Sequence, residues 1–240
     1  PGTSKLLHEV LIDLIDIDPQ NVYTPDGTIA KESIFDFCKD YEKKIEKLGG
    51  LDLTLVEFGP SGNLAFNEPG SQINSSTRLM LLGSESRHNF AKLFHSNEAV
   101  PHSAITMGIS TLLGAKKVIV VGWGETISPY VRQAIEAPAS DTVPASFLQS
   151  HKESKFVLDL SSAEHLTRLS TPWLVTSCEW DDKLIRRAIV WLCRITGKPI
   201  LKLTNKDYND NGLSELLALF GSAYNVNIKI FNDLQHTITG

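Results

Sequence analysis

The chain has 240 residues, of which 42% are hydrophobic, and a formal net charge of -5 at pH 7. This length and apolar content suffice for one large domain or two small ones with a substantial core. Lysine and arginine are scattered along the sequence, which argues against nucleic acid as a partner, because phosphate binding needs clustered cations. No apolar run reaches the roughly 20 residues that span a bilayer, and the first residues lack the pattern of a signal peptide.

The cysteines and histidines predict neither a disulfide framework nor a metal site. Cys38, Cys178 and Cys193 are too few and too far apart for either. Their aromatic and apolar neighbours indicate buried thiols, which suits a reducing cytoplasm. The seven histidines include no H-x-x-x-H or H-E-x-x-H pair.

Helical and extended patterns alternate along the first two thirds of the chain. Leu6–Ile15 has helical spacing and predicts an amphipathic helix that ends near Pro19. Ser33–Leu48 predicts a second one, stopped by two glycines. Strands are predicted at Leu51–Phe58, Leu79–Leu82 and Val118–Val121, with a helix near Glu85–Phe94. The alternation favours an α/β fold with a largely parallel sheet covered by helices.

The residues after about 170 read as a second, smaller unit. Helices are predicted at Asp181–Thr196 and Leu213–Phe220. Strands are predicted at Trp173–Val175, Ile200–Leu203 and Val226–Phe231, the last from its alternating apolar residues. We therefore expect a small α/β extension over residues 171–240, packed on a domain formed by residues 1–170.

The segment Leu51–Ser71 has the form of an active-site loop. Its apolar strand ends in Gly59-Pro60-Ser61-Gly62, residue types that turn a chain sharply and let its backbone approach a ligand. In open α/β sheets, ligands bind just beyond the carboxyl ends of the strands, where this loop would lie. An ordinary Gly/Pro connection with a few polar side chains fits the same spacing.

The loop also carries a family resemblance. It is similar to the glucosamine-6-phosphate deaminase/isomerase pattern G-x-D-G-H-I-A-F-N-E-P, whose places are taken by Gly59, Gly62, Ala65, Phe66, Asn67, Glu68 and Pro69. Ser76-Thr77-Arg78 resembles the family's S-R-T-R, and Pro101–Ala115 resembles its P-x-x-A-I-T-M-G-I-G-T-I-L-x-A helix region. The match covers about residues 4–170.

The resemblance implies both a fold and a chemistry. The fold would be the three-layer α/β fold shared by the deaminase and ribose-phosphate isomerase families, a mostly parallel sheet with helices on both faces. Family members open a sugar ring, move a proton between C2 and C1, and expel ammonia, without a metal or organic cofactor. It further implies an amino-sugar phosphate as ligand and a tendency to form homo-oligomers.

Departures from the family pattern fall on the catalytic positions. The family's ring-opening histidine corresponds to Asn63, and the aspartate that orients it corresponds to Ser61, so that only Glu68 is retained. An amide cannot exchange a proton near neutral pH, so Asn63 cannot act as general acid or base. The family's lysine that contacts phosphate falls on Ile127. Its arginine near the substrate phosphate falls on Lys92, which keeps the charge but loses the bidentate fork.

Other family positions imply binding roles. By resemblance, Gly59, Gly62, Asn67 and Lys92 would line the substrate site. Ser71 and Arg78 match positions that line an effector-phosphate site in some relatives, although the family's effector lysine corresponds to Met80.

The family's glycine-rich phosphate loop and its Asp-Glu-Tyr segment have no counterpart in these 240 residues. We therefore expect a fragment of a longer protein, with a sugar de-N-acetylase-like domain following residue 240. Three functions stay open: a sugar-phosphate domain without turnover, a structural or assembly module for that neighbouring domain, and an enzyme with altered chemistry that uses Glu68.

Overall fold

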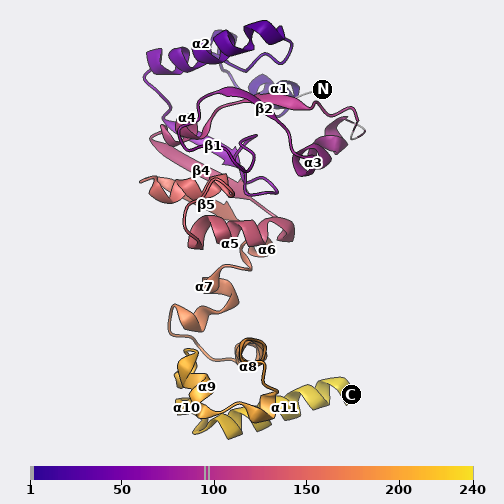
Figure 1. Cartoon of the computed structure of the whole chain (residues 1–240), viewed down its shortest axis with the longest axis vertical. Helices are drawn as coiled ribbons and strands as arrows, with labels where there is room; N and C mark the ends of the chain where they lie inside the picture. The colour runs from indigo at the N-terminus through magenta and orange to yellow at the C-terminus, as the bar shows by residue number, and fades with distance from the viewer. Residues whose placement is uncertain (1–2, 95, 97, 240) are drawn as a thin grey trace. The chain divides into compact units, whose positions relative to one another are not determined.

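The computed structural model describes residues 3–94, 96 and 98–239. It divides into two compact units, Pro1–His165 and Leu166–Gly240. The first holds every strand in the described part of the chain, and each unit is considered by itself (Figure 1).

The N-terminal unit is built on a three-stranded parallel sheet. Its strands are β1 (Leu53–Glu57), β4 (Lys117–Gly122) and β5 (Ser154–Leu158), in the order β1-β4-β5. The register places Leu55 beside Ile119, and Ile119 beside Lys155. The strands predicted in the β1 and β4 regions are confirmed, and so is the α/β class with a mostly parallel sheet.

One face of this sheet forms part of the core. Successive side chains of a strand point to opposite faces, and Thr54 and Val56 of β1 are buried while their neighbours are exposed. The helices that connect the strands, α4 (Ile109–Leu113) and α5 (Ser128–Glu136), contribute further buried residues. The buried apolar set includes Val118, Val120, Ile109, Leu112, Val131 and Ala134.

A second, antiparallel pair of strands lies between β1 and β4 in sequence. It consists of β2 (Arg78–Leu81) and β3 (Ser103–Thr106), and α3 (Ser84–Phe94) connects them. The expected helix region Pro101–Ala115 is therefore a strand followed by the short helix α4. Gly108, the N-cap of α4, has no room for a side chain, since a Cβ there would collide with the carbonyl oxygen of Ser75.

Glu42 fastens this pair to the preceding helix, α2 (Ile34–Lys47), which lies alongside β2 (Figure 1). Its Oε1 accepts hydrogen bonds from the Thr77 amide and from the Thr111 hydroxyl, both at 2.6 Å. One carboxylate thus joins α2 to the start of β2 and to α4. The predicted helix Ser33–Leu48 is confirmed within a residue at each end.

The first helix is shorter than predicted. The α1 helix covers only Thr3–Val10, because Leu11 leaves the helical region with φ -141° and ψ -63°, and a 3₁₀ turn follows at Ile12–Leu14. The remaining short helices of this unit are the 3₁₀ turns Pro19–Asn21, Lys31–Ser33, Glu125–Ile127 and Pro144–Ser150, and α6 (Leu160–Ala163).

In the C-terminal unit every regular element of the described residues is helical. The helices are α7 (Thr167–Ser170), α8 (Asp182–Thr196), α9 (Asn205–Asp210), α10 (Ser214–Phe220) and α11 (Ala223–Thr239), with 3₁₀ turns at Pro172–Leu174 and Ile200–Lys202. The helices predicted at 181–196 and 213–220 are confirmed.

The three predicted C-terminal strands are wrong, and with them the α/β character expected of residues 171–240. Val226 and Ile230 are both buried, which is the i, i+4 spacing of a helix face; the intervening Ile228 made the segment look like a strand. The other two segments are short apolar runs directly after Pro172 and Pro199, and such runs do not distinguish strands from turns of helix.

The C-terminal unit has its own hydrophobic core, which contains Trp173, Ile189, Leu192, Tyr208 and Val226. The Trp173 ring packs against the rings of Trp180 and Trp191, with centroids 6.1 and 5.4 Å away. The buried Tyr208 hydroxyl donates to Asn227 Oδ1 at 2.7 Å, and Asn227 Nδ2 donates to the Leu203 carbonyl oxygen at 2.9 Å, so this buried polar pair is satisfied within the unit.

Asp207 makes the stability of this unit sensitive to acid. It forms a capping box with Thr204, and Lys198 Nζ lies 2.7 Å from its Oδ1. The hydrogen bond from Lys198, with those from Thr204, lowers the pKa of Asp207 from 3.8 to about 2. Because the folded pKa is the lower one, this contribution is present above pH 3.8 and is lost as the pH falls towards 2.

We therefore expect Asp207→Asn to flatten the fall in melting temperature of the C-terminal unit between about pH 4 and pH 2. Far-UV circular dichroism at a series of pH values measures it. The matched control is Asp210→Asn, which removes only an exposed pair with Lys206 and should keep the wild-type profile. Equal slopes for Asp207→Asn and wild type would contradict the assignment.

Candidate functional site

The predicted loop begins where β1 ends, at the carboxyl edge of the parallel sheet. The Phe58 amide still pairs with the Val121 carbonyl oxygen at 2.8 Å, and then the chain turns back. The Gly59 amide donates to the Asn63 carbonyl oxygen at 2.8 Å, which closes a tight turn. Gly62 takes φ +77°, and a Cβ there would lie 2.7 Å from Val143 Cγ1, so the turn requires glycine.

Ser61 and Asn63, which stand where the family pattern has its catalytic aspartate and histidine, are hydrogen-bonded to each other. The Ser61 hydroxyl donates to Asn63 Oδ1 at 3.0 Å, and Asn63 Nδ2 donates to the Ala65 carbonyl oxygen at 2.6 Å. Only 3% of Asn63 is exposed, and a Cβ on Gly59 would overlap its amide. The buried Asn63 amide therefore stabilises the turn by hydrogen bonds to Ser61 and Ala65. Neither the Ser61 nor the Asn63 side chain carries a group that exchanges protons near neutral pH.

The loop backbone is strained two residues after Asn63. Ala65 has φ +50°, the left-handed region that residues with a Cβ rarely adopt. Strain of this kind persists where surrounding contacts hold it, and it gathers at ligand-binding segments. The bond from Asn63 Nδ2 to the Ala65 carbonyl is one such contact.

Hydrogen bonds of Asn67 and Arg78 connect the loop to the rest of the N-terminal unit. Asn67 is fully buried, and its Nδ2 donates to the carbonyl oxygens of Leu64 and Met107 at 3.0 and 2.8 Å. Arg78 donates from Nη1 to Asn67 Oδ1 at 2.9 Å and from Nη2 to Ser71 Oγ at 3.0 Å. Burial lowers the pKa of Arg78, but a guanidinium stays protonated in proteins.

The side chains of Asn67 and Ser71 are thus both hydrogen-bonded to the Arg78 guanidinium. An effector phosphate at Arg78 would have to displace Asn67 or Ser71 from the guanidinium.

Glu68 lies at the end of the loop and is half-buried. Its Oε1 accepts a hydrogen bond from the Gly83 amide at 3.3 Å, just before α3 begins at Ser84. Loop closure continues at Gly70, whose amide donates to the Asp141 carbonyl oxygen at 2.7 Å. The contacts at Gly83 and Asp141 were not predicted, because residues so far apart in sequence are joined only by the tertiary fold.

The remaining predicted positions differ in environment. Ile127 is buried and lies close to Gly122, so this position contributes to the core. Met80 is half-buried on β2. Lys92 belongs to α3, but its side chain lies outside the described residues.

A second group of polar contacts lies beyond the carboxyl ends of β4 and β5. Asp159 directly follows β5, and its Oδ1 accepts from the amides of Ser162 and Gly124, at 2.8 and 3.2 Å. The hydrogen bonds from Ser162 lower the pKa of Asp159 from its usual value. Gly124 and Asp159 each come shortly after one of two adjacent parallel strands, and this position could have predicted that they meet. The sequence analysis did not predict this contact.

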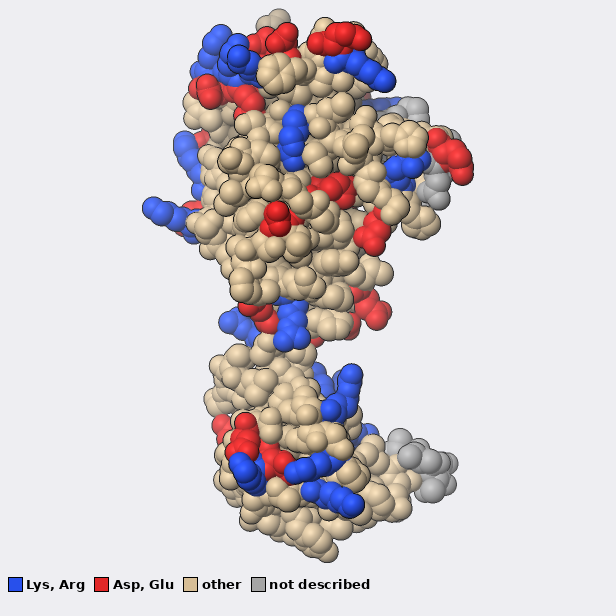
Figure 2. Space-filling model, viewed as in Figure 1, with Lys and Arg blue, Asp and Glu red and all other residues tan. Residues whose placement is uncertain are grey.

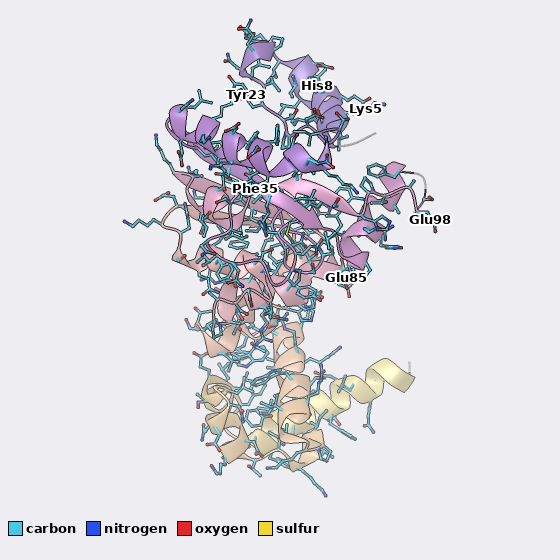
Figure 3. The ribbon with its side chains drawn as sticks, turned by 45° about the horizontal axis from the view of Figure 1, so that its top comes forward. Lys5, His8, Tyr23, Phe35, Glu85 and Glu98 are labelled. Carbon is cyan, nitrogen blue, oxygen red and sulfur yellow. The ribbon has the colours of Figure 1, made fainter. Side chains whose placement is uncertain are left out.

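A surface hollow lies elsewhere in the unit. It is lined by Val22, Tyr23, Thr24, Phe37, Asp40, Tyr41 and Lys44, without any residue of the loop. Lys44 Nζ sits 3.5 Å from the centre of the Tyr23 ring, and the Tyr41 hydroxyl donates to the Tyr23 carbonyl at 3.1 Å. Tyr23 is thus held beside α2 (Figure 3).

The described residues contain no group of three His, Cys, Asp or Glu side chains placed to hold a metal ion. Within the same residues no helix combines the length and apolarity of a membrane span. Figure 2 shows lysines and arginines interspersed with acidic residues on the N-terminal unit, whose middle on this face is mostly uncharged apart from a few acidic residues.

Comparison with known proteins identifies the family. The model of the glucosamine-6-phosphate isomerases/6-phosphogluconolactonase family matches residues 2–157. The chain belongs to this family. It is 63% identical, over 98% of its length, to a glucosamine-6-phosphate deaminase-like protein of Bacteroides thetaiotaomicron. It is 37% identical, over 67% of its length, to the glucosamine-6-phosphate deaminase of Shewanella woodyi.

A solved structure agrees with the fold of this family member. A monomeric glucosamine-6-phosphate deaminase superimposes with a TM-score of 0.64 and 30% identity, over 66% of this chain and 65% of that one. The chain spans 35% of the Bacteroides relative and 60% of the Shewanella relative. The resemblance that the loop motifs implied is thereby confirmed at the level of family and fold.

The Arg78 fastening can be tested by substitution. Arg78→Ala leaves the buried Asn67 Oδ1 and Ser71 Oγ without a donor, which should lower the free energy of unfolding by about 1–3 kcal/mol. Arg78→Lys keeps the charge without the fork and should lie between alanine and wild type. Urea unfolding measures both, and Arg132→Ala, which breaks an exposed pair with Glu136, is the control. An Arg78→Ala variant as stable as wild type would contradict this role.

Proposed function

We propose that this chain binds an amino-sugar phosphate, as a glucosamine-6-phosphate deaminase-like protein that does not deaminate its ligand. The Ser61–Asn63 pair carries the proposal. Deamination by this family requires proton transfer, and the two side chains at the relay positions are a hydroxyl and a buried amide that bond to each other. Neither can serve as a general acid or base near neutral pH.

Support for retained binding comes from the backbone of the loop. The turn at Gly59 and Gly62 lies at the carboxyl end of a parallel strand, which is where ligands bind in open α/β sheets. Backbone amides bind phosphate or sugar hydroxyl groups without any ionisable side chain. Binding can therefore outlast the loss of the catalytic residues.

A scaffold function, holding a neighbouring catalytic domain of a longer protein, is the second candidate. The observation that favours it is the mutual engagement of Asn67, Ser71 and Arg78, which ties up polar groups that a ligand would otherwise meet.

A thermal-shift titration with glucosamine 6-phosphate distinguishes the two. A ligand at ten times its dissociation constant stabilises the native state by about 1.4 kcal/mol. For a domain of this size we expect the melting temperature to rise by about 3–6 °C. Inorganic phosphate at the same concentration is the control for non-specific anion effects. No shift at millimolar sugar phosphate would favour the scaffold.

An ammonia-release assay tests the absence of turnover. We expect no release above background from glucosamine 6-phosphate, with or without Glu68→Gln. The altered-chemistry alternative makes the opposite prediction, since Glu68 is the one retained carboxylate of the family relay. Release by the wild-type chain that disappears in Glu68→Gln would overturn the proposal.

A further inference from the structure

Glu57 is the last residue of β1 and comes directly before the loop of the candidate site. Alternate residues of a strand face opposite sides of a sheet, so its side chain lies on the side away from the buried Thr54 and Val56. The register places Glu57 beside Val121, near the carboxyl end of β4. Its exposed side chain therefore stands at the edge where open α/β sheets bind their ligands.

The loop folds back beside this glutamate. Phe58 forms an antiparallel bridge with Leu64, and both side chains are buried. In such a bridge, the residue before one partner and the residue after the other lie at the same end, and here these residues are Glu57 and Ala65. Both are exposed, and Ala65 has the strained φ of +50°. Glu57 thus lies at the same end of the bridge as the strained segment, and strain of this kind gathers at ligand-binding sites.

The carboxyl group of Glu57 has no partner among the described residues. No hydrogen bond or ion pair engages it there, while loss of hydration to the surrounding chain raises the pKa of Glu57. The Glu68 and Asp159 carboxylates, by contrast, accept hydrogen bonds from backbone amides. A partly dehydrated carboxylate without a partner is unfavourable, and a cation bound beside it offsets that cost. Groups perturbed in this way gather at functional sites.

An amino-sugar phosphate brings such a cation, because its amine is protonated. Backbone N–H groups of the loop can bind its phosphate or hydroxyl groups, but they offer no acceptor to an ammonium group. The polar side chains of the loop that are already hydrogen-bonded within the chain are Ser61, Asn63, Asn67 and Ser71. Carboxylates form the strong, charge-assisted bonds with ammonium groups, and Glu57 is available to do so at the base of the loop.

We propose that the Glu57 carboxylate binds the protonated amine of the sugar and thereby selects amino-sugar phosphates over analogues that carry a hydroxyl group in its place. The inference rests on the proposed function, because it concerns the ligand of the same loop. A hydroxyl group can also donate to Glu57, but the bond from an ammonium is about twice as strong. Selectivity therefore comes from the charge of the ligand.

Calorimetric titration at about pH 6.5 tests this role, because amines are protonated and carboxyl groups ionised there. We expect the chain to bind glucosamine 6-phosphate about tenfold more tightly than glucose 6-phosphate. Glu57→Gln keeps the shape of the side chain and removes its charge. It should weaken binding of glucosamine 6-phosphate about tenfold and change that of glucose 6-phosphate by less than about twofold.

The matched control is Glu125→Gln. Glu125 is also exposed and follows β4 at the same edge of the sheet, so its substitution changes the net charge equally. This variant should keep the wild-type preference for the amino sugar. Both substitutions are at exposed positions, so the melting temperatures should stay within about 1 °C of wild type.

The possible failures are distinguishable. Equal loss of preference in Glu57→Gln and Glu125→Gln would overturn the inference, because the net charge of the edge would then select the amine. Equal binding of the two sugar phosphates by the wild-type chain, or a preference that survives Glu57→Gln, would overturn it too, while the proposed function would stand. Binding of neither sugar phosphate would overturn the proposed function and this inference together.

Discussion

The loop after β1 depends on one buried amide. Asn67 has no contact with water, so each of its polar atoms must find a partner within the protein. Its donors hold Leu64 within the loop and Met107 beyond β3, and its acceptor receives the guanidinium of Arg78. A single side chain thereby joins the later part of the loop to the residue that follows β3 and to the first residue of β2.

Much of the N-terminal unit follows from local sequence pattern. The β1 strand, the α2 helix and the glycine turn of the loop were all predicted, because alternation, helical spacing and turn residues are local signals. The engagement of Arg78 with Asn67 and Ser71 was not predicted. It depends on β2 bringing residue 78 back to the loop, and no spacing rule encodes that return.

The C-terminal unit shows the limit of such reasoning. Val226, Ile228 and Ile230 alternate as in a strand, yet Val226 and Ile230 also share one side of a helix. Burial of that side against the core with Tyr208 and Leu192 decides between the two. Family motifs likewise identify which positions have changed, whereas the pairing of Ser61 with Asn63 comes from the folded loop.

The distribution of tryptophan has a practical consequence for spectroscopy of this protein. Of the four tryptophans, Trp173, Trp180 and Trp191 form one cluster in the C-terminal unit, and Trp123 alone lies in the N-terminal unit, where it is 60% exposed. Intrinsic emission will therefore be dominated by the helical unit. An optical probe aimed at the loop after β1 needs a fluorophore introduced near it, since the natural ones report on the other half of the molecule.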